Sequence, residues 1–176
     1  MALTRVWVRI CALNLAAKFN AQILTHTRVS AIDPAQKTLQ TSAGQIVYDQ
    51  LVLAIGADPI AHGLAGNAAA DVISVNDLND YRRFRSALAA GKQVTILGGG
   101  LIGCEFANDL AASGQRVDLL HRGAWPLERL IPQVVGDCLT QAMATLGVTW
   151  HFGRTATRVE RDATGYTLTL DDGATL

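Results

Sequence analysis

The sequence predicts an α/β fold in which helices cover both faces of a parallel β-sheet. Three observations between residues 72 and 176 indicate this fold. Short apolar strands alternate there with segments of helical periodicity. One strand–helix–strand unit fits within about 30 residues, the length that a parallel crossover requires. A glycine-rich turn joins the first strand of that unit directly to its helix.

The second half of the chain divides cleanly into these elements. A helix capped by Asn76 or Asp77 carries apolar residues at helical spacing and ends before Gly91. The elements expected after it are, in order, a strand over 93–97, a helix over 101–113, a strand over 116–120, a helix over 133–146, a strand over 148–152, and a hairpin of strands over 156–161 and 166–170.

The first 60 residues predict strands. Residues 21–29 alternate apolar and polar side chains, which is typical of a strand, before the breaker Asp33-Pro34. Residues 37–41 and 45–48 flank a short glycine turn and predict a hairpin. Residues 50–55 form a continuous apolar run, which indicates a strand covered on both faces. Together these segments form a β-meander that leads into a buried strand.

Length and composition are those of a globular protein. Of the 176 residues, 49% are hydrophobic and 17% are charged, unlike a disordered segment. Lys plus Arg and Asp plus Glu are 15 each, which argues against a nucleic-acid binder. No apolar run reaches the roughly 18 residues of a membrane span. The three cysteines include no CxxC pair, so we expect a reduced, cytoplasmic protein without a metal site or a membrane partner.

Residues 98–103 carry the chemistry. They satisfy G-x-G-x-x-G directly after a predicted strand and at the start of a predicted helix, the context of a Rossmann-type dinucleotide site. Gly98 permits the tight turn, Gly100 lets a pyrophosphate approach the backbone, and Gly103 lets the helix pack on the strand. The free N–H groups of the first helical turn then hold the phosphates. The alternative is a glycine-rich turn with no ligand.

The end of the second strand departs from the usual pattern. An acidic residue is expected there to bind the ribose of NAD, but the position holds His121-Arg122. This basic pair either meets the 2′-phosphate of NADP or lies in solvent. Glu105, read as part of the first turn of the helix, either complements the helix dipole or contacts a cofactor ring. Cys104 is read as a buried packing residue, so no catalytic side chain is predicted.

Three segments resemble one family. GGGLIGCEFANDL (98–110) resembles the NAD motif of the FAD-dependent pyridine nucleotide–disulfide oxidoreductases, and YDQLVLAIGADP (48–59) is similar to their second FAD motif. FNAQILTHTRVSAIDP (19–34), together with GCEFAND, is similar to the bacterial rubredoxin–NAD reductases within that superfamily.

This resemblance implies cofactors, a partner and site residues. FAD would pass electrons from NADH, or alternatively NADPH, to rubredoxin as the acceptor, with no protein nucleophile. The NAD pyrophosphate would meet Gly98, Gly100, Leu101, Ile102 and Gly103. The FAD would meet Val29 at its adenine and Ala54, Ile55 and Gly56 at its pyrophosphate, and Glu105 would lie at the flavin–nicotinamide junction.

The departures from the family imply a fragment, truncated at both ends. The first FAD motif of the family, its later Gly-Asp motif and its C-terminal domain have no counterpart. The expected division is a ragged terminus over 1–14, a β-meander remnant of the FAD domain over 15–60, a linker and helix over 61–91, and an NAD(P) domain over 92–176. Whether this chain is an active enzyme stays open. The alternatives are a non-catalytic dinucleotide-binding fragment and a ferredoxin, nitrite or disulfide reductase of the same superfamily.

Overall fold

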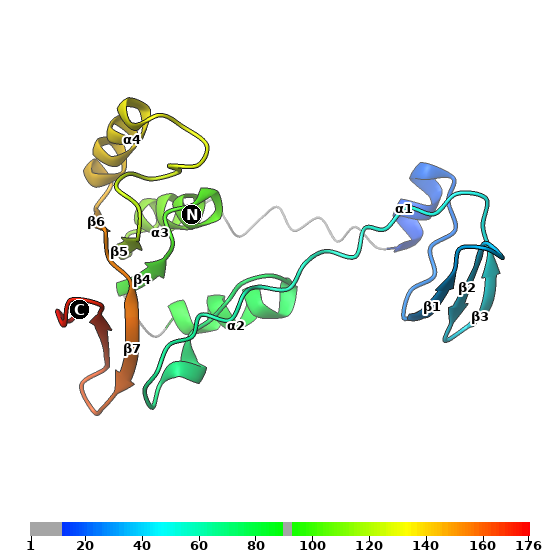
Figure 1. Ribbon diagram of the computed structural model, residues 1–176, viewed down its shortest axis with the longest axis horizontal. Coiled ribbons are helices and arrows are strands. Elements are labelled where there is room, and N and C mark those ends of the chain that lie inside the picture. Colours follow the sequence, from blue (N-terminus) through cyan, green and yellow to red (C-terminus); the bar gives the residue numbers. More distant parts are fainter. Residues whose placement is uncertain (1–11, 90–92) are drawn as a thin grey trace. The chain divides into compact units, whose positions relative to one another are not determined.

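Two compact units make up the chain in the computed structural model, which describes residues 12–89 and 93–176 (Figure 1). The first unit ends at Ala57 and the second begins at Asp58. Most of the expected ragged terminus and the expected helix stop at Gly91 lie outside the described residues. The four-part division of the chain at residues 14, 60 and 91 stays a prediction.

The first unit contains the expected meander. Strands β1 (Val29–Asp33), β2 (Thr38–Thr41) and β3 (Gly44–Val47) pair antiparallel in that order. The Asp33 carboxylate accepts hydrogen bonds from the N–H groups of the two residues that follow Pro34, both at 2.9 Å, and so turns the chain after β1. Helix α1 (Ala12–Phe19) precedes the sheet and was not expected.

Two strand predictions in this unit are wrong. Residues 21–28 are irregular, because His26 has a φ of 54°, a left-handed conformation that interrupts an extended chain. Residues 50–55 form no strand, since no segment within the described residues pairs with them. Most of their apolar side chains are therefore open to solvent, with Val52 at 85% and Ile55 at 87% exposure. An apolar run forms a covered strand only where it pairs with other strands of a sheet.

The second unit confirms the α/β class. Strands β4 (Gln93–Leu97), β5 (Arg116–His121) and β6 (Val148–Phe152) form a parallel sheet in that order. Helix α3 (Leu101–Ala112) connects β4 to β5, and α4 (Gln133–Thr145) connects β5 to β6. None of the helices in the described ranges is long and apolar enough to cross a bilayer.

The remaining elements of this unit flank the parallel sheet. Helix α2 (Leu78–Leu88) begins at Asp77, which forms a capping box with Asp80. A short 3₁₀ helix, η1 (Ala69–Asp71), precedes it. Strands β7 (Ala156–Arg161) and β8 (Tyr166–Leu170) form the predicted antiparallel hairpin.

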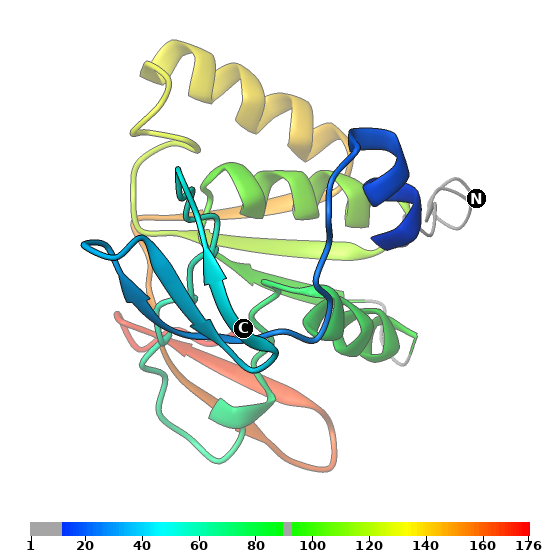
Figure 2. The same cartoon turned by 90° about the vertical axis from the view of Figure 1, so that its right-hand side faces the viewer.

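The central strand β5 is buried from both sides. Val117 and Leu119 point toward a cluster formed with α3 and α4, which contains Cys104, Ala107, Leu110, Ala111, Met143 and Val148. Leu120 points the other way, as successive residues of a strand do, and packs with Leu64, Ala68, Val159, Leu168 and Leu170. The helices α3 and α4 thus lie on one side of β5 and the hairpin β7–β8 on the other (Figure 2). Within the described residues the hairpin therefore packs on the face for which a second layer of helices was expected. This packing leaves the carboxyl ends of β4 and β5 together at one edge.

Candidate dinucleotide site

The glycine-rich loop lies at the carboxyl end of β4, between that strand and α3. Gly98 has a φ of 113°, a conformation that side chains rarely adopt, so this turn requires glycine. Its N–H donates to the carbonyl of Leu120 at 2.8 Å, which joins the loop to β5. The turn therefore forms at the junction of two parallel strands, where open α/β sheets bind their ligands.

Gly103 and Gly100 are glycines for different reasons. A Cβ on Gly103 would overlap the carbonyl oxygen of Gly98, so the close contact between helix and loop excludes any side chain there. A Cβ on Gly100 would meet nothing within 4 Å, and the φ of −81° suits any residue. The fold itself does not need glycine at position 100. A pyrophosphate lying against the backbone at that position fits this open space.

The start of α3 presents free backbone donors beside this space. Gly100 is the N-cap residue and supplies no side-chain hydrogen bond to the first turn. Leu101 and Ile102 follow it with exposed apolar side chains. Uncapped N–H groups at a helix N-terminus, together with the helix dipole, attract a phosphate. The residues present therefore fit the diphosphate of a dinucleotide.

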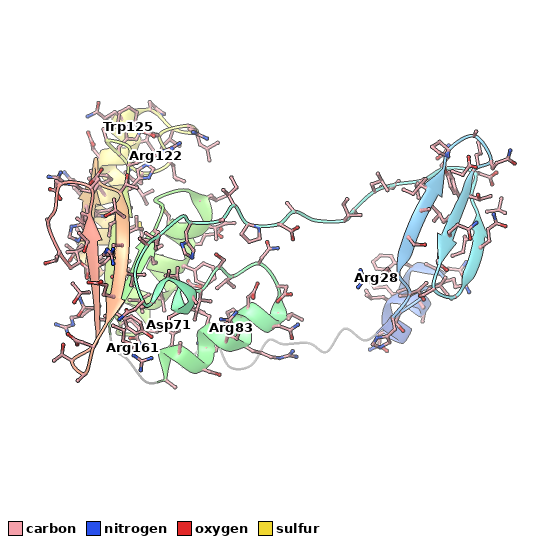
Figure 3. All side chains as sticks on the ribbon, turned by 60° about the horizontal axis from the view of Figure 1, so that its bottom comes forward. Arg28, Asp71, Arg83, Arg122, Trp125 and Arg161 are labelled. Carbon is pink, nitrogen blue, oxygen red and sulfur yellow. The ribbon has the colours of Figure 1, made fainter. Side chains whose placement is uncertain are left out.

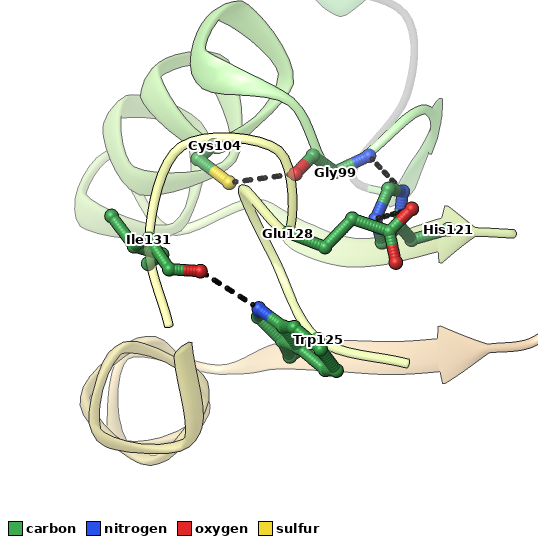
Figure 4. Close-up of polar contacts among 6 residues, drawn as sticks. All are labelled: Gly99, Cys104, His121, Trp125, Glu128 and Ile131. Carbon is green, nitrogen blue, oxygen red and sulfur yellow. Dashed lines mark hydrogen bonds and ion pairs between the residues drawn. The ribbon is translucent and has the colours of Figure 1, made fainter. Parts of the chain in front are cut away.

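Gly99 is held at both of its backbone groups. Its N–H donates to Nδ1 of His121 at 3.2 Å (Figure 4). Its carbonyl accepts from the N–H of Leu127 at 2.9 Å. The Cys104 thiol also points at this carbonyl, with sulfur and oxygen 3.6 Å apart. Because these partners come from α3, from β5 and from the segment after β5, the loop conformation is fixed from three directions.

The two members of the basic pair have different environments. The His121 side chain is only 11% exposed and lies beneath the loop, whereas Arg122 is exposed and lies with Trp125 on the segment after β5 (Figure 3). The reading in which both side chains lie in solvent is therefore wrong for His121. Since Nδ1 accepts a hydrogen bond from Gly99, the proton of a neutral His121 ring lies on Nε2.

Glu105 and Cys104 follow the loop on α3. The first turn of α3 contains no acidic residue, so of the two readings of Glu105 the charge–dipole placement is wrong, and contact with a cofactor ring stays a prediction. Its side chain is exposed in the next turn. Cys104 is buried in the helix cluster, and this burial raises the pKa of its thiol. That environment fits a packing residue. Across the described residues, no group of three His, Cys, Asp or Glu side chains could hold a metal ion.

The residues expected to meet FAD belong to the first unit. Val29 begins β1 and is about half exposed, while Ala54, Ile55 and Gly56 follow the meander in an exposed, irregular segment. Gly56 has a φ of 71° and open space at its Cβ position. Residues 54–56 do not end a paired strand here, and their contact with the flavin diphosphate stays a prediction.

The segment that follows β5 contributes to the site and was not predicted from the sequence. Trp125 donates from Nε1 to the carbonyl of Ile131 at 3.1 Å (Figure 4). Its ring packs against Gly136 of α4. Glu128, from the same segment, reaches within 4.0 Å of His121. The length of the segment could have indicated it. Strand–helix connections usually span about 2–6 residues, and residues 122–132 exceed that range. Long loops of this kind are often functional.

Comparison with known proteins agrees with this geometry. The family model described as pyridine nucleotide-disulphide oxidoreductase matches residues 5–176. A rubredoxin-NAD(+) reductase of Alcanivorax borkumensis is 42% identical over 164 residues, which cover 93% of this chain and 43% of that protein. A nitric oxide reductase FlRd-NAD(+) reductase of Aeromonas hydrophila is 35% identical, over 92% of this chain and 42% of that protein.

Solved structures give the same result. A ferredoxin reductase from Rhodopseudomonas palustris superposes with a TM-score of 0.81 at 25% identity, over 95% of this chain and 42% of that one. The chain thus spans less than half the length of the relatives it matches. These matches confirm the resemblance and the cofactors expected with it, FAD and NADH or NADPH. The chain belongs to the pyridine nucleotide-disulphide oxidoreductase family.

Proposed function

We propose that the chain supplies the nicotinamide-dinucleotide site of an FAD-dependent reductase that passes electrons from NADH, or NADPH, to rubredoxin or a similar iron protein. The names of its relatives, rubredoxin-NAD(+) and FlRd-NAD(+) reductases, support the choice of acceptor. We propose a cytoplasmic location, because the three cysteines include no CxxC pair.

The glycine loop carries this proposal. A side chain at position 100 would enter open space, so the fold does not require glycine there. This position lies at a helix N-terminus without a side-chain cap. In the proposed complex, the N–H groups of Leu101, Ile102 and Gly103 bind the pyrophosphate while Gly98 and Gly100 keep the backbone accessible. Glu105, on the same helix, would lie toward the flavin–nicotinamide junction. Bound FAD would supply the redox chemistry, with Val29, Ala54, Ile55 and Gly56 on its adenosine and pyrophosphate side.

The proposed binding site is tested by titrating the full chain with NADH and with ADP-ribose, using the variant Gly100→Val. The valine side chain would fill the space left for the pyrophosphate, so binding should be lost while the far-ultraviolet circular dichroism spectrum stays that of the wild type. Ala112→Val, at the exposed other end of α3, is the matched control and should bind normally. Unchanged affinity of Gly100→Val would overturn the assignment of the loop.

The redox proposal needs a visible absorption spectrum of the purified chain, before and after anaerobic NADH and then NADPH. A flavin spectrum that bleaches supports the reductase function, and reduction of added rubredoxin then tests the acceptor. The exposed residues 50–55 favour a second candidate, a chain that binds nicotinamide dinucleotide without FAD. A colourless protein that still binds NADH would establish that candidate instead.

A further inference from the structure

A carboxylate occupies the edge of the sheet at which the usual acidic residue is missing. Oε1 of Glu128 lies 4.0 Å from Nε2 of His121, the last residue of β5 (Figure 4). The same carboxylate lies directly over Gly123, where an added Cβ would overlap it. The side chain is 30% exposed, so its neighbours cover the carboxylate in part while it remains accessible to a ligand.

The position of Glu128 follows from the anchoring of its segment. Leu127, its neighbour in the chain, donates its N–H to the carbonyl of Gly99 in the glycine loop. Trp125 is fixed by its hydrogen bond to Ile131, and the N–H of Ile131 in turn donates to the carbonyl of Leu127 at 3.0 Å. Glu128 is therefore attached, through one residue, to the loop that is proposed to hold the pyrophosphate.

We propose that Glu128 binds the adenosine ribose of the nicotinamide cofactor and thereby selects NADH over NADPH. This inference rests on the proposed function. In dinucleotide sites of this type, a carboxylate near the end of the second strand accepts hydrogen bonds from the ribose hydroxyls and repels a 2′-phosphate. Here His121 stands at the strand end, and the carboxylate comes from the following segment.

His121 acts as a positioning residue for this carboxylate. Its Nδ1 accepts from the N–H of Gly99, so a neutral ring directs its Nε2 proton away from the loop. Nε2 is buried and has no hydrogen-bond partner within the described part of the chain, and Glu128 is the acidic side chain that faces it. A buried donor of this kind favours an acceptor oriented toward it. The imidazole thus links the glycine loop to the ribose carboxylate.

Two arginines oppose this assignment. Arg122 follows His121 and Arg129 follows Glu128, and guanidinium groups at this edge would attract a 2′-phosphate. Both side chains are exposed, whereas the Glu128 carboxylate is partly buried against His121 and Gly123. A partly buried carboxylate loses less side-chain freedom on binding a ligand than an exposed arginine does, and this favours Glu128 in recognition.

The test uses the full chain and two ligands that differ only at the ribose, ADP-ribose and 2′-phospho-ADP-ribose, titrated by calorimetry. The wild type should bind ADP-ribose more tightly. Glu128→Gln should lower the affinity for ADP-ribose by about tenfold, which corresponds to one hydrogen bond to a charged group. The affinity for 2′-phospho-ADP-ribose should not fall. Glu128→Asp, which keeps the charge, should keep the preference. Glu160→Gln on β7, an exposed glutamate far along the chain, should leave both affinities unchanged.

Two further variants separate positioning from stability. His121→Asn should shift the ratio of the two affinities in the same direction as Glu128→Gln, whereas a purely structural role would lower both affinities equally. Arg122→Gln should leave the ADP-ribose affinity unchanged. The inference is overturned if the ratio of the two affinities in Glu128→Gln is within about twofold of the wild-type ratio. It is also overturned if the wild type prefers 2′-phospho-ADP-ribose and Arg122→Gln removes that preference. A wild type that binds neither ligand overturns the proposed function itself.

Discussion

Replacing Gly103 by alanine tests whether the glycine loop and α3 are packed as closely as the structure has them. A Cβ at this position would overlap the carbonyl oxygen of Gly98 and lie 3.1 Å from its carbonyl carbon. Both obstacles are backbone atoms, which cannot rotate away as the end of a side chain can. Either the loop or the helix must therefore shift.

The expected magnitude combines two opposing effects. Overpacking of a tight contact costs about 1–3 kcal/mol. Alanine in place of glycine inside a helix raises the free energy of unfolding by about 1 kcal/mol. Because the obstruction at Gly103 is rigid, the cost lies toward the upper end of its range, and we expect Gly103→Ala to lower the free energy of unfolding by about 1–2 kcal/mol. The ADP-ribose affinity should also fall, since the loop is displaced.

Gly100→Ala is the matched control for this prediction. Its Cβ enters open space at an ordinary φ, so the loss of a favourable N-cap residue and the reduced freedom of the unfolded chain roughly offset each other. Urea unfolding followed by tryptophan fluorescence should give wild-type stability for Gly100→Ala and reduced stability for Gly103→Ala. If Gly103→Ala is as stable as the wild type, or if both variants lose stability equally, the distinction drawn between the two glycines is wrong.

Three further predictions concern the second unit. Asp77→Ala removes a carboxylate that accepts from the N–H groups of Asn79 and Asp80 at 2.7 and 2.9 Å, and should lower the stability of α2 by about 1 kcal/mol, measured by hydrogen exchange of that helix. Leu119→Ala empties a fully buried position of β5 and should cost about 2–5 kcal/mol in urea unfolding; a loss under about 1 kcal/mol would contradict the packing described. Burial raises the pKa of the Cys104 thiol, so less thiolate is present at any given pH, and alkylation at pH 8 should be about tenfold slower than at the exposed Cys138 until the chain is unfolded.

The sequence predicted those elements whose determinants are local. The strands over 93–97, 148–152, 156–161 and 166–170 have the predicted bounds, because each is an apolar or alternating run closed by turn residues. The strand predicted over 50–55 was wrong because pairing, and not the run itself, makes a strand.

The candidate site, too, was predicted only where its determinants are local. The glycine motif identified the loop, since its residue types follow directly from backbone conformation and close packing. The position of His121 depends on Gly99, 22 residues earlier, and on Glu128 from a segment without periodicity. Contacts of that kind are set by the tertiary fold, and no pattern of neighbouring residues encodes them.

The attachment of Gly99 has a consequence for the order of folding. Two of the three residues that hold its backbone, His121 and Leu127, are synthesised after the whole of α3. A nascent chain that ends in the α3–β5 connection already contains every glycine of the motif but neither of these partners. Non-local contacts form late because the chain between them must first be closed. The glycine loop should therefore be among the last parts of the second unit to reach its final conformation, well after α3 has formed.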